Sequence, residues 1–402
     1  MNPKITVAFV AMAIAFAGCK TKRPAFKPAR AKTQITELHM LNARDGWAWS
    51  GGLPGQNSLL RTHDGGMSWR DVTPRGFSQI EEGACFRDAR TAWIPIFNRT
   101  NVTAGLLHTT DGGKSWSLLN RTNTPFFNDA SSCRFYSSTY GVGNSSDNGA
   151  GSAYVTFFET HDSGKTWSQI PFTPRFSDLA ESNTFHLSNI GGDRIAFYPP
   201  ASVMITYGDT ADEKPKGFVR FSRTTDLGKN WRDMELPLPK QFEDSLCVVP
   251  FGPVFVDKQN IVLAAHVFES TSNSYSNGAL IFYTSHDGGA TWFAREGMIA
   301  LKQPWYTVKV VSPKCFFVAN GPDICVTHDG AQSWQTIVPN ISFGGNSKRD
   351  IVRMDFVDAT HGWLLISDNS QFYPDGKFIL YRTADGGKTW SELPVRVLIE
   401  TR

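Results

Sequence analysis

An eight-residue pattern, Thr/Ser-x-Asp-x-Gly-x-Ser/Thr-Trp, occurs seven times along this chain of 402 residues. The copies are THDGGMSW (62–69), TTDGGKSW (109–116), THDSGKTW (160–167), TTDLGKNW (224–231), SHDGGATW (285–292), THDGAQSW (327–334) and TADGGKTW (383–390). Consecutive copies begin 42 to 64 residues apart, and one four-stranded antiparallel unit needs about 40–50 residues. The chain is therefore a repeat protein, and we call these segments the repeated turns.

Each repeated turn has the composition of a tight hairpin. Its Asp is expected to fold back and accept backbone N–H groups, and its later Gly to take a positive φ that a side chain resists. Ala331 replaces that Gly in one copy and Asn230 replaces Ser/Thr in another, so these two turns should be strained or reshaped. We interpret the seven Asp residues as structural, because each satisfies its own turn. They are Asp64, Asp111, Asp162, Asp226, Asp287, Asp329 and Asp385.

The Trp that ends each repeated turn should open the next strand and pack between sheets. Burial of one Trp removes roughly 200 Å² of surface from water, which stabilises the fold by at most about 5 kcal/mol. These seven indoles are thus expected to be the main hydrophobic framework. They are Trp69, Trp116, Trp167, Trp231, Trp292, Trp334 and Trp390.

A second element, aromatic-x-Asp-x-x-x-Gly-Trp, precedes the repeated turns. Its clearest copy is Phe356–Trp363. Degenerate copies are Met40–Trp47, Phe86–Trp93, Phe135–Val142, Phe255–Val262 and Val310–Phe317. Each repeat then reads as strand A, this turn, strand B, a variable loop, strand C, the repeated turn and strand D. The sequence therefore predicts an all-β, seven-bladed β-propeller of four-stranded antiparallel blades that fills residues 34–402.

The composition agrees with many short strands. The chain has 35 Gly, 22 Pro, 29 Phe and 12 Trp, and only 19% charged residues, which disfavours long helices. Its formal net charge of +3 is too small to indicate nucleic acid as the main partner.

The repeated turns resemble the Asp-box, or BNR, repeats of sialidases, sortilin-type receptors and photosystem II assembly-factor propellers. With Gly-Trp early and the TxDGGxTW form late, the repeat unit is most similar to the photosystem II assembly or stability-factor group, which also occurs in bacteria without photosystems. The resemblance covers nearly the whole chain after residue 33. It implies the propeller fold and leaves function open, because propellers serve as enzymes and as scaffolds.

The N-terminal region has the pattern of an export signal. A positive start is followed by an apolar run over 5–17 and by Phe16-Ala17-Gly18-Cys19, which resembles a bacterial lipobox. We predict a signal peptide over 1–18, a lipid-carrying Cys19, and a basic flexible tether over 19–33. An ordinary secretory signal with a chance Cys is the alternative. Because Lys20 rather than Asp follows the Cys, a Gram-negative host would send the protein to its outer membrane. In a photosynthetic host we expect the thylakoid lumen.

Export would place five further cysteines in an oxidising compartment. An odd number leaves at least one of them unpaired within the chain. Two pairs are compatible with the expected strand positions: Cys315 with Cys325 across one hairpin, and Cys85 with Cys133 between blades 2 and 3. The fifth is Cys247.

No motif indicates a catalytic, cofactor or metal site. HExxH and CxxC are absent from the sequence, and the His residues of the repeated turns belong to separate blades. A sialidase of this fold carries a Phe/Tyr-Arg-Ile-Pro segment, further Arg residues, an Asp and a Tyr–Glu pair. The segment before Thr62 contains no such motif. We predict a protein that is not an enzyme, with a glycosidase as the alternative.

The segments between blades repeat a combination of Pro, a base and an aromatic residue, as in Pro74-Arg75-Gly76-Phe77. Basic and aromatic side chains together suit a carboxylate-bearing protein surface, although these aromatics could instead fill the gaps between blades. The candidate partner-binding residues are Arg75, Phe77, Arg121, Arg175, Phe176, Lys240, Phe242, Lys302, Trp305 and Arg349. Long B–C loops at 207–217, 269–278 and 367–376 are a second candidate surface.

These features predict a non-catalytic, exported and lipid-anchored propeller. It would bind a protein partner, as an assembly or stability factor near a membrane. The alternatives are a secreted glycoside hydrolase and a receptor for carbohydrate or peptide. No cofactor is predicted.

Overall fold

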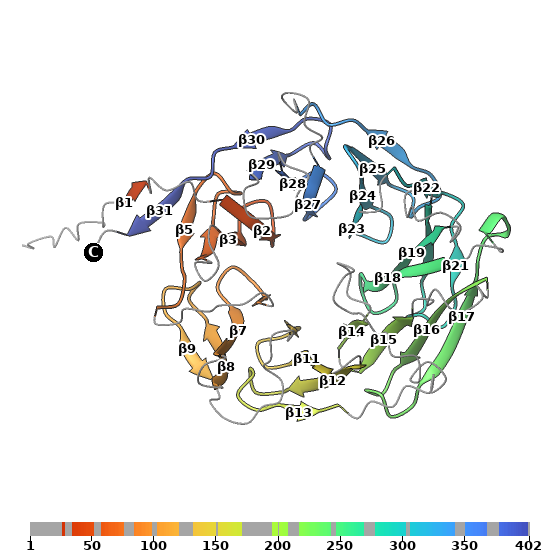
Figure 1. Ribbon diagram of the computed structural model, residues 1–402, viewed down its shortest axis with the longest axis horizontal. Helices are drawn as coiled ribbons and strands as arrows, with labels where there is room; N and C mark the ends of the chain where they lie inside the picture. The colour runs from red at the N-terminus through yellow and green to blue at the C-terminus, as the bar shows by residue number, and fades with distance from the viewer. Residues whose placement is uncertain are drawn as a thin grey trace, which may run out of the picture.

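The computed structural model describes residues 26–28, 34–51, 58–75, 84–98, 103–119, 132–149, 152–170, 195–199, 201–207, 217–242, 247–268, 278–302, 306–341, 350–367 and 378–400. These residues form seven antiparallel sheets set in a ring around a central axis (Figure 1). The prediction of an all-β, seven-bladed propeller is therefore confirmed. Within the described residues the one helix is the short η1 (Lys240–Phe242), and no helix there is long and apolar enough to cross a membrane.

The first four blades follow the predicted strand order. Blade 1 contains β2 (Gln34–Met40), β3 (Gly46–Gly51), β4 (Ser58–Thr62) and β5 (Trp69–Asp71). Blade 2 contains β6 (Cys85–Phe86), β7 (Ala92–Asn98), β8 (Thr103–Thr109) and β9 (Ser117–Leu119). Blade 3 contains β10 (Ser132–Phe135), β11 (Gly141–Gly149), β12 (Ser152–Thr160) and β13 (Ser168–Gln169). Blade 4 contains β14 (Ile195–Tyr198), β15 (Ser202–Tyr207), β16 (Phe218–Thr224) and β17 (Arg232–Pro237).

The last three blades repeat the order. Blade 5 contains β18 (Cys247–Phe255), β19 (Ile261–Phe268), β20 (Ala279–Ser285) and β21 (Phe293–Ala294), and β22 (Ile299–Ala300) also pairs with β20. Blade 6 contains β23 (Tyr306–Val310), β24 (Phe316–Asn320), β25 (Asp323–Thr327) and β26 (Gln335–Ile337). Blade 7 contains β27 (Asp350–Phe356), β28 (Gly362–Ser367), β29 (Phe378–Thr383) and β30 (Ser391–Leu393).

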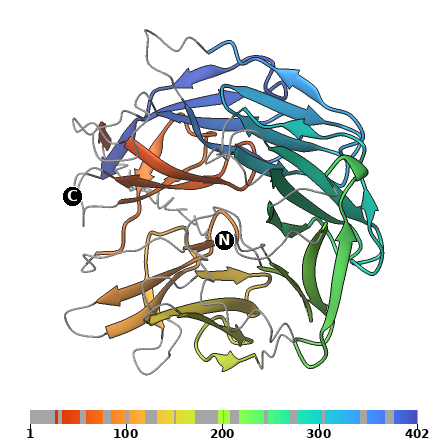
Figure 2. The ribbon, with the colours of Figure 1, turned by 45° about the vertical axis from the view of Figure 1, so that its right-hand side comes forward.

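The two ends of the chain meet on the sheet of blade 1, which therefore has six strands. The four strands A to D of each blade are consecutive in the chain, and the last strand, β31 (Val397–Glu400), runs parallel to β5 at the outside of blade 1. The first strand, β1 (Phe26–Pro28), then pairs antiparallel with β31. Figure 2 shows the strands of the first blade beside those of the last. The three residues of β1 fall inside the predicted tether, and in the structure they are a strand.

The hydrophobic core lies between neighbouring blades. One cluster joins blade 1 to blade 7 and includes Trp69 and Trp363, which are 1% and 0% exposed. A second joins blades 1 and 2 around Trp47 and Trp49. The seven indoles of the repeated turns are therefore not the main framework that the sequence suggested, because only Trp69 and Trp390 among them are buried. The indoles of strand B in blades 1, 2 and 7 are fully buried and share this role.

The carboxylate of each repeated turn is held by its own turn. In blade 7, Asp385 accepts the backbone N–H of Thr389 at 2.9 Å and its hydroxyl at 2.6 Å. Hydrogen bonds from the Thr389 side chain and backbone, with that from Thr383, outweigh desolvation and lower the pKa of Asp385 to about 2. The equivalent bonds in the other six turns show the same fold-back, as predicted.

Two consecutive residues of each repeated turn have a positive φ, rather than the later Gly alone. Ser163 and Leu227 take φ of 68° and 55° at the earlier position, and Ala331 takes 68° at the later one. The strain expected at Ala331 is therefore present. Asn230 leaves the turn unchanged, because its Nδ2 donates to Asp226 at 2.7 Å in place of a hydroxyl.

One of the two expected cysteine pairs is present. Cys85 and Cys133 form a disulfide between blades 2 and 3, with their Cα atoms 5.8 Å apart. The expectation for Cys315 and Cys325 is wrong, because both are buried free thiols. Cys325 lies opposite Val318, three residues from Cys315. The two side chains therefore point to opposite faces of blade 6, into separate clusters.

Candidate functional site

The structure describes four of the predicted partner-binding residues. Arg75 and Lys240 are exposed, whereas Phe242 is partly buried and packs against the cluster between blades 4 and 5. Lys302 is more than half exposed, and its Nζ pairs with Asp323. The others lie outside the described residues, as does Cys19. They are Phe77, Arg121, Arg175, Phe176, Trp305 and Arg349.

The three described bases follow the outer strands of their blades. Arg75 comes four residues after the end of β5, and Lys240 three residues after the end of β17. Lys302 comes two residues after β22, which pairs with strand C of blade 5. Because strand D is the outer of the four blade strands, with only β31 and β1 beyond it in blade 1, these bases lie toward the rim of the ring. The long B–C loops fall almost wholly outside the described residues.

A different set of charged residues lies on the inner strands, which surround the axis (Figure 1). We call it the axial cluster: Glu37 and His39 on β2, Arg134 on β10, Lys309 on β23, and Arg353 and Asp355 on β27. Its buried member is Asp355, which is 7% exposed. One oxygen of Asp355 is 2.6 Å from Lys309 Nζ, and the other accepts the backbone N–H of Met40 at 2.7 Å. This carboxylate therefore ties blades 6, 7 and 1 together.

The remaining axial residues interact across the same region. Arg353 Nη2 lies 3.8 Å from Glu37 Oε1. Desolvation lowers the pKa of His39, Asp355 opposes this shift, and Lys309 and Arg134 reinforce it. Hence His39 is neutral at pH 7. Residues from blades 1, 3, 6 and 7 thus share one electrostatic environment.

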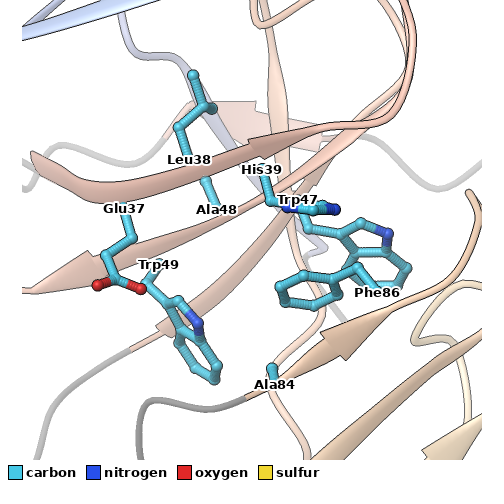
Figure 3. Close-up of a pocket in the computed structure, with 8 residues that line it drawn as sticks. All are labelled: Glu37, Leu38, His39, Trp47, Ala48, Trp49, Ala84 and Phe86. Carbon is cyan, nitrogen blue, oxygen red and sulfur yellow. The ribbon is translucent and has the colours of Figure 1, made fainter. Parts of the chain in front are cut away.

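Beside the axial cluster is a cavity of about 160 Å³ between blades 1 and 2. Figure 3 shows the Glu37 carboxylate above the ring of Trp49, and His39, Trp47 and Phe86 together on the other side. The rings of Trp47 and Phe86 are stacked at 5.1 Å, and the His39 ring lies 5.5 Å from Phe86. The lining is completed by Leu38, Ala48 and Ala84.

The axial cluster was not predicted from the sequence, although a signal for it exists. His39, Arg134, Lys309 and Asp355 each directly precede the residue that starts the turn between strands A and B. Comparison of this one position across the repeats would have found them. Among the described residues, no group of three or more His, Cys, Asp or Glu side chains gathers as a metal site would require.

Comparison with known proteins identifies the fold. A scan against protein-family models finds no match, and a search of curated proteins finds none either. Among solved structures, the chain is similar to YCF48 bound to D1 peptide, with 17% identity, a TM-score of 0.51, and coverage of 90% of this chain and 96% of that one. It is also similar to YCF48 from Cyanidioschyzon merolae, with 15% identity, a TM-score of 0.50, and coverage of 90% and 97%.

An enzyme shares the same architecture. A polysaccharide lyase, the PL25 ulvan lyase bound to -[GlcA(1-4)Rha3S]-, matches with 10% identity, a TM-score of 0.52, and coverage of 91% of this chain and 97% of that one. At identities this low, the structural matches establish a common propeller fold and nothing more. They leave the function to be argued from the residues.

Proposed function

We propose that this chain is a non-catalytic propeller that binds a protein partner, as an assembly or stability factor near a membrane. The observation that carries the proposal is the axial cluster, in which three permanent cations and two carboxylates from four blades share one electrostatic environment. Such a mixed-charge centre on a rigid ring suits the charged and polar groups of a polypeptide. The similar fold of YCF48, which has been solved with a D1 peptide, supports a peptide-binding role.

The pairing of the carboxylates favours binding over catalysis. Asp355 is held by Lys309 and the Met40 N–H, and Glu37 lies beside Arg353. A glycosidase needs one carboxyl group to give a proton and a second to act as base or nucleophile. The Asp residues of the repeated turns are engaged in their own hydrogen bonds, as Asp385 shows.

Export and lipid anchoring are part of the proposal. The Cys85–Cys133 disulfide supports an oxidising compartment, because disulfides persist mainly outside the cytosol. The sequence around Cys19 supports the anchor. Replacing Cys19 with Ser should release the protein from membranes or leave it unprocessed. Normal maturation and membrane fractionation of that variant would contradict the anchor.

A carbohydrate-binding or carbohydrate-cleaving propeller is the second candidate function. The observation in its favour is the cavity with Trp49, Phe86 and Glu37, since aromatic faces and carboxylates also recognise sugars. Release of reducing ends or unsaturated products from polysaccharides by the purified protein would support it.

The main test uses partner capture. Cross-linked complexes from detergent-solubilised membranes are compared for the wild type, for Arg134→Glu combined with Arg353→Glu in the axial cluster, and for Arg75→Glu combined with Arg175→Glu in the connectors. Loss of two contacts of about 1 kcal/mol each, with added repulsion, should reduce recovery at least tenfold. The melting temperature should change little, because exposed charges contribute little to stability.

A matched control makes the same charge change on the other face of the ring. Arg44 and Lys258 are exposed in turns between strands A and B, so Arg44→Glu combined with Lys258→Glu should leave capture unchanged. Equal capture by the wild type and the Arg75/Arg175 variant would contradict partner binding through these connectors. The long B–C loops would then be tested next.

A further inference from the structure

We propose that the outer edge of blade 1 is the surface that rests against the anionic lipid headgroups of a membrane. This edge is formed by β5, β31 and β1, and we call it the closure edge. The inference rests on the lipid anchor in the proposed function, because it says which part of the ring that anchor holds at the membrane.

The first and last strands of the chain lie together at the closure edge. β31 pairs in parallel with β5, and Val397 lies beside Trp69. β1 pairs antiparallel with β31, and Phe26 lies beside Glu400. In Figure 1, β1 and β31 project outward from blade 1, on the side of the ring opposite β17 and β21. The N-terminal region is therefore attached to the ring at this edge.

The proposed anchor is close to this edge along the chain. Cys19 lies seven positions before Phe26, and an extended chain advances at most about 3.6 Å per residue. Covalent geometry therefore keeps the Cα atom of Cys19 within about 25 Å of that of Phe26. Because a lipid on Cys19 would be inserted in the bilayer, pairing of β1 with β31 keeps the closure edge near the membrane.

Two exposed arginines lie on one face of the closure edge. Trp69 and Val397 are neighbours in β5 and β31, and both are buried. Arg396 directly precedes β31, and its backbone oxygen accepts the N–H of Trp69 at 2.8 Å. Because side chains alternate along a strand, Arg70 and Arg396 point to the face opposite the buried pair, and both are exposed. Exposed guanidinium groups suit the phosphates of lipid headgroups.

The carboxylates of the closure edge do not cancel this charge. Asp71 lies on the face opposite Arg70, and it accepts the backbone N–H and the hydroxyl of Thr73 at 2.9 and 2.6 Å. In the sequence, Glu400 on β31 is balanced by Lys27 on β1. Residues 20–25 add three bases and no acid. The edge and the chain that leads to it are therefore net positive.

Other parts of the ring suit an anionic surface less well. The outer strands β9, β13, β21 and β26 contain no charged residue, and β30 contains one Glu. β17 contains one Arg, one Asp and one Glu. The repeated turns carry seven Asp and four Lys, and the turns between strands A and B carry four Asp and five Lys or Arg. The turn face is thus net negative, so the ring should stand on its closure edge rather than lie on that face.

The test uses the mature chain in vesicles of phosphatidylethanolamine and phosphatidylglycerol. The photo-cross-linker p-benzoylphenylalanine replaces Met67, which is 51% exposed and lies two residues before β5. In a matched control it replaces Ala290, which is exposed at the same position of the repeated turn in blade 5. After irradiation, the lipid attached at each position is measured by mass spectrometry. We expect at least tenfold more at position 67 than at position 290.

Two charge variants test the role of the arginines. Arg70→Glu combined with Arg396→Glu should lower lipid cross-linking at position 67 at least fivefold while the lipid keeps the chain on the vesicles. Lys229→Glu combined with Arg232→Glu makes the same charge change at exposed positions of blade 4 and should leave that cross-linking unchanged.

Three results would overturn the proposal. Equal cross-linking at positions 67 and 290 would show that the ring lies flat, and cross-linking at position 67 that ignores the change at Arg70 and Arg396 would remove their role. A chain that does not float with the vesicles would refute the anchor as well. Partner capture that still depends on Arg134 and Arg353 would leave the proposed partner binding in place, so the two failures are distinguishable.

Discussion

The indole Nε1 of Trp363 in blade 7 donates a hydrogen bond of 2.9 Å to the backbone oxygen of Gly65 in blade 1, although the two residues are 298 positions apart. Arg382 covers the Trp363 ring and donates to the backbone oxygen of Ala43 at 3.2 Å. Trp47 and Arg61 make comparable contacts between blades 1 and 2. The two ends of the ring are therefore held by the same kind of contact that holds blades joined by the chain.

Loss of the hydrogen bond from Trp363 to Gly65 should weaken the contact between blades 7 and 1. Trp363→Phe keeps most of the ring packing but leaves the Gly65 oxygen without its partner, which costs about 1–3 kcal/mol when the group is buried. We expect lower stability in urea and faster hydrogen exchange in β2 and β31. Trp47→Phe is the control, since it removes a similar bond between blades that the chain connects. Equal exchange of β31 in both variants would argue against a specific closure role.

The disulfide should contribute strongly because it spans 48 residues of sequence. Closing a loop of this size in the unfolded chain is worth about 4 kcal/mol in the chain-entropy account. We expect Cys85→Ser combined with Cys133→Ser, or a reducing agent, to lower stability by about 2–4 kcal/mol in urea unfolding. The reducing agent should have no further effect on the double variant. A further loss there would point to a second disulfide.

The regular parts of the fold could be predicted because each depends on contacts within one repeat. The Asp of every repeated turn bonds to residues at most four positions away, so a short pattern carries the whole geometry. Strand register follows in the same way from the turns between strands A and B, as the pairing of Phe356 with Gly362 shows. The Cys85–Cys133 pair could be predicted for a related reason, because alignment of two repeats gives the direction of each side chain.

The axial cluster and the closure depend on contacts between repeats. Asp355 meets Met40 across 315 positions, and no local pattern records this distance. The side chains of strand A also differ in charge from blade to blade, so what repeats is a position of the blade and not a residue type. The pairing of Cys315 with Cys325 failed because the register of one hairpin was misjudged, and one shifted position reverses a side chain's direction.

Gly112 and Ser163 occupy the same position of the repeated turn in blades 2 and 3, and both have positive φ, 79° and 68°. A Cβ at Gly112 would lie 1.5 Å from Arg61 Nη1. In blade 2, the residue equivalent to Arg61 is His108 on β8. Glycine at this position is thus needed both for its backbone angle and for the Arg of the preceding blade.

Reciprocal substitutions test this explanation. Ser163→Gly should stabilise the protein by about 1 kcal/mol, because a left-handed conformation costs a residue with a side chain about 1–2 kcal/mol. Gly112→Ser should destabilise it by more than the reverse change gains, since the Arg61 guanidinium must also move from the Gly112 oxygen, 3.1 Å away. Urea unfolding gives both values. Equal and opposite effects would show that backbone strain alone decides this position.

His266 on β19 should make the protein sensitive to mild acid. Its side chain is 4% exposed, its Nε2 has no hydrogen-bond partner within the described part of the chain, and desolvation lowers its pKa to about 4. The unfolded chain takes up this proton near pH 6.5, so stability is complete above that pH and falls as the pH drops toward 4. The loss between pH 7 and 4.5 should be about 2 kcal/mol.

His266→Phe, which suits the neighbouring Phe268 and Tyr306 rings, should remove this part of the pH dependence in urea unfolding. The Asp residues of the repeated turns are a separate source of acid sensitivity, because pKa values lowered to about 2, as for Asp385, place their loss below pH 4. If the variant and the wild type lose equal stability between pH 7 and 4.5, another group is responsible for the sensitivity.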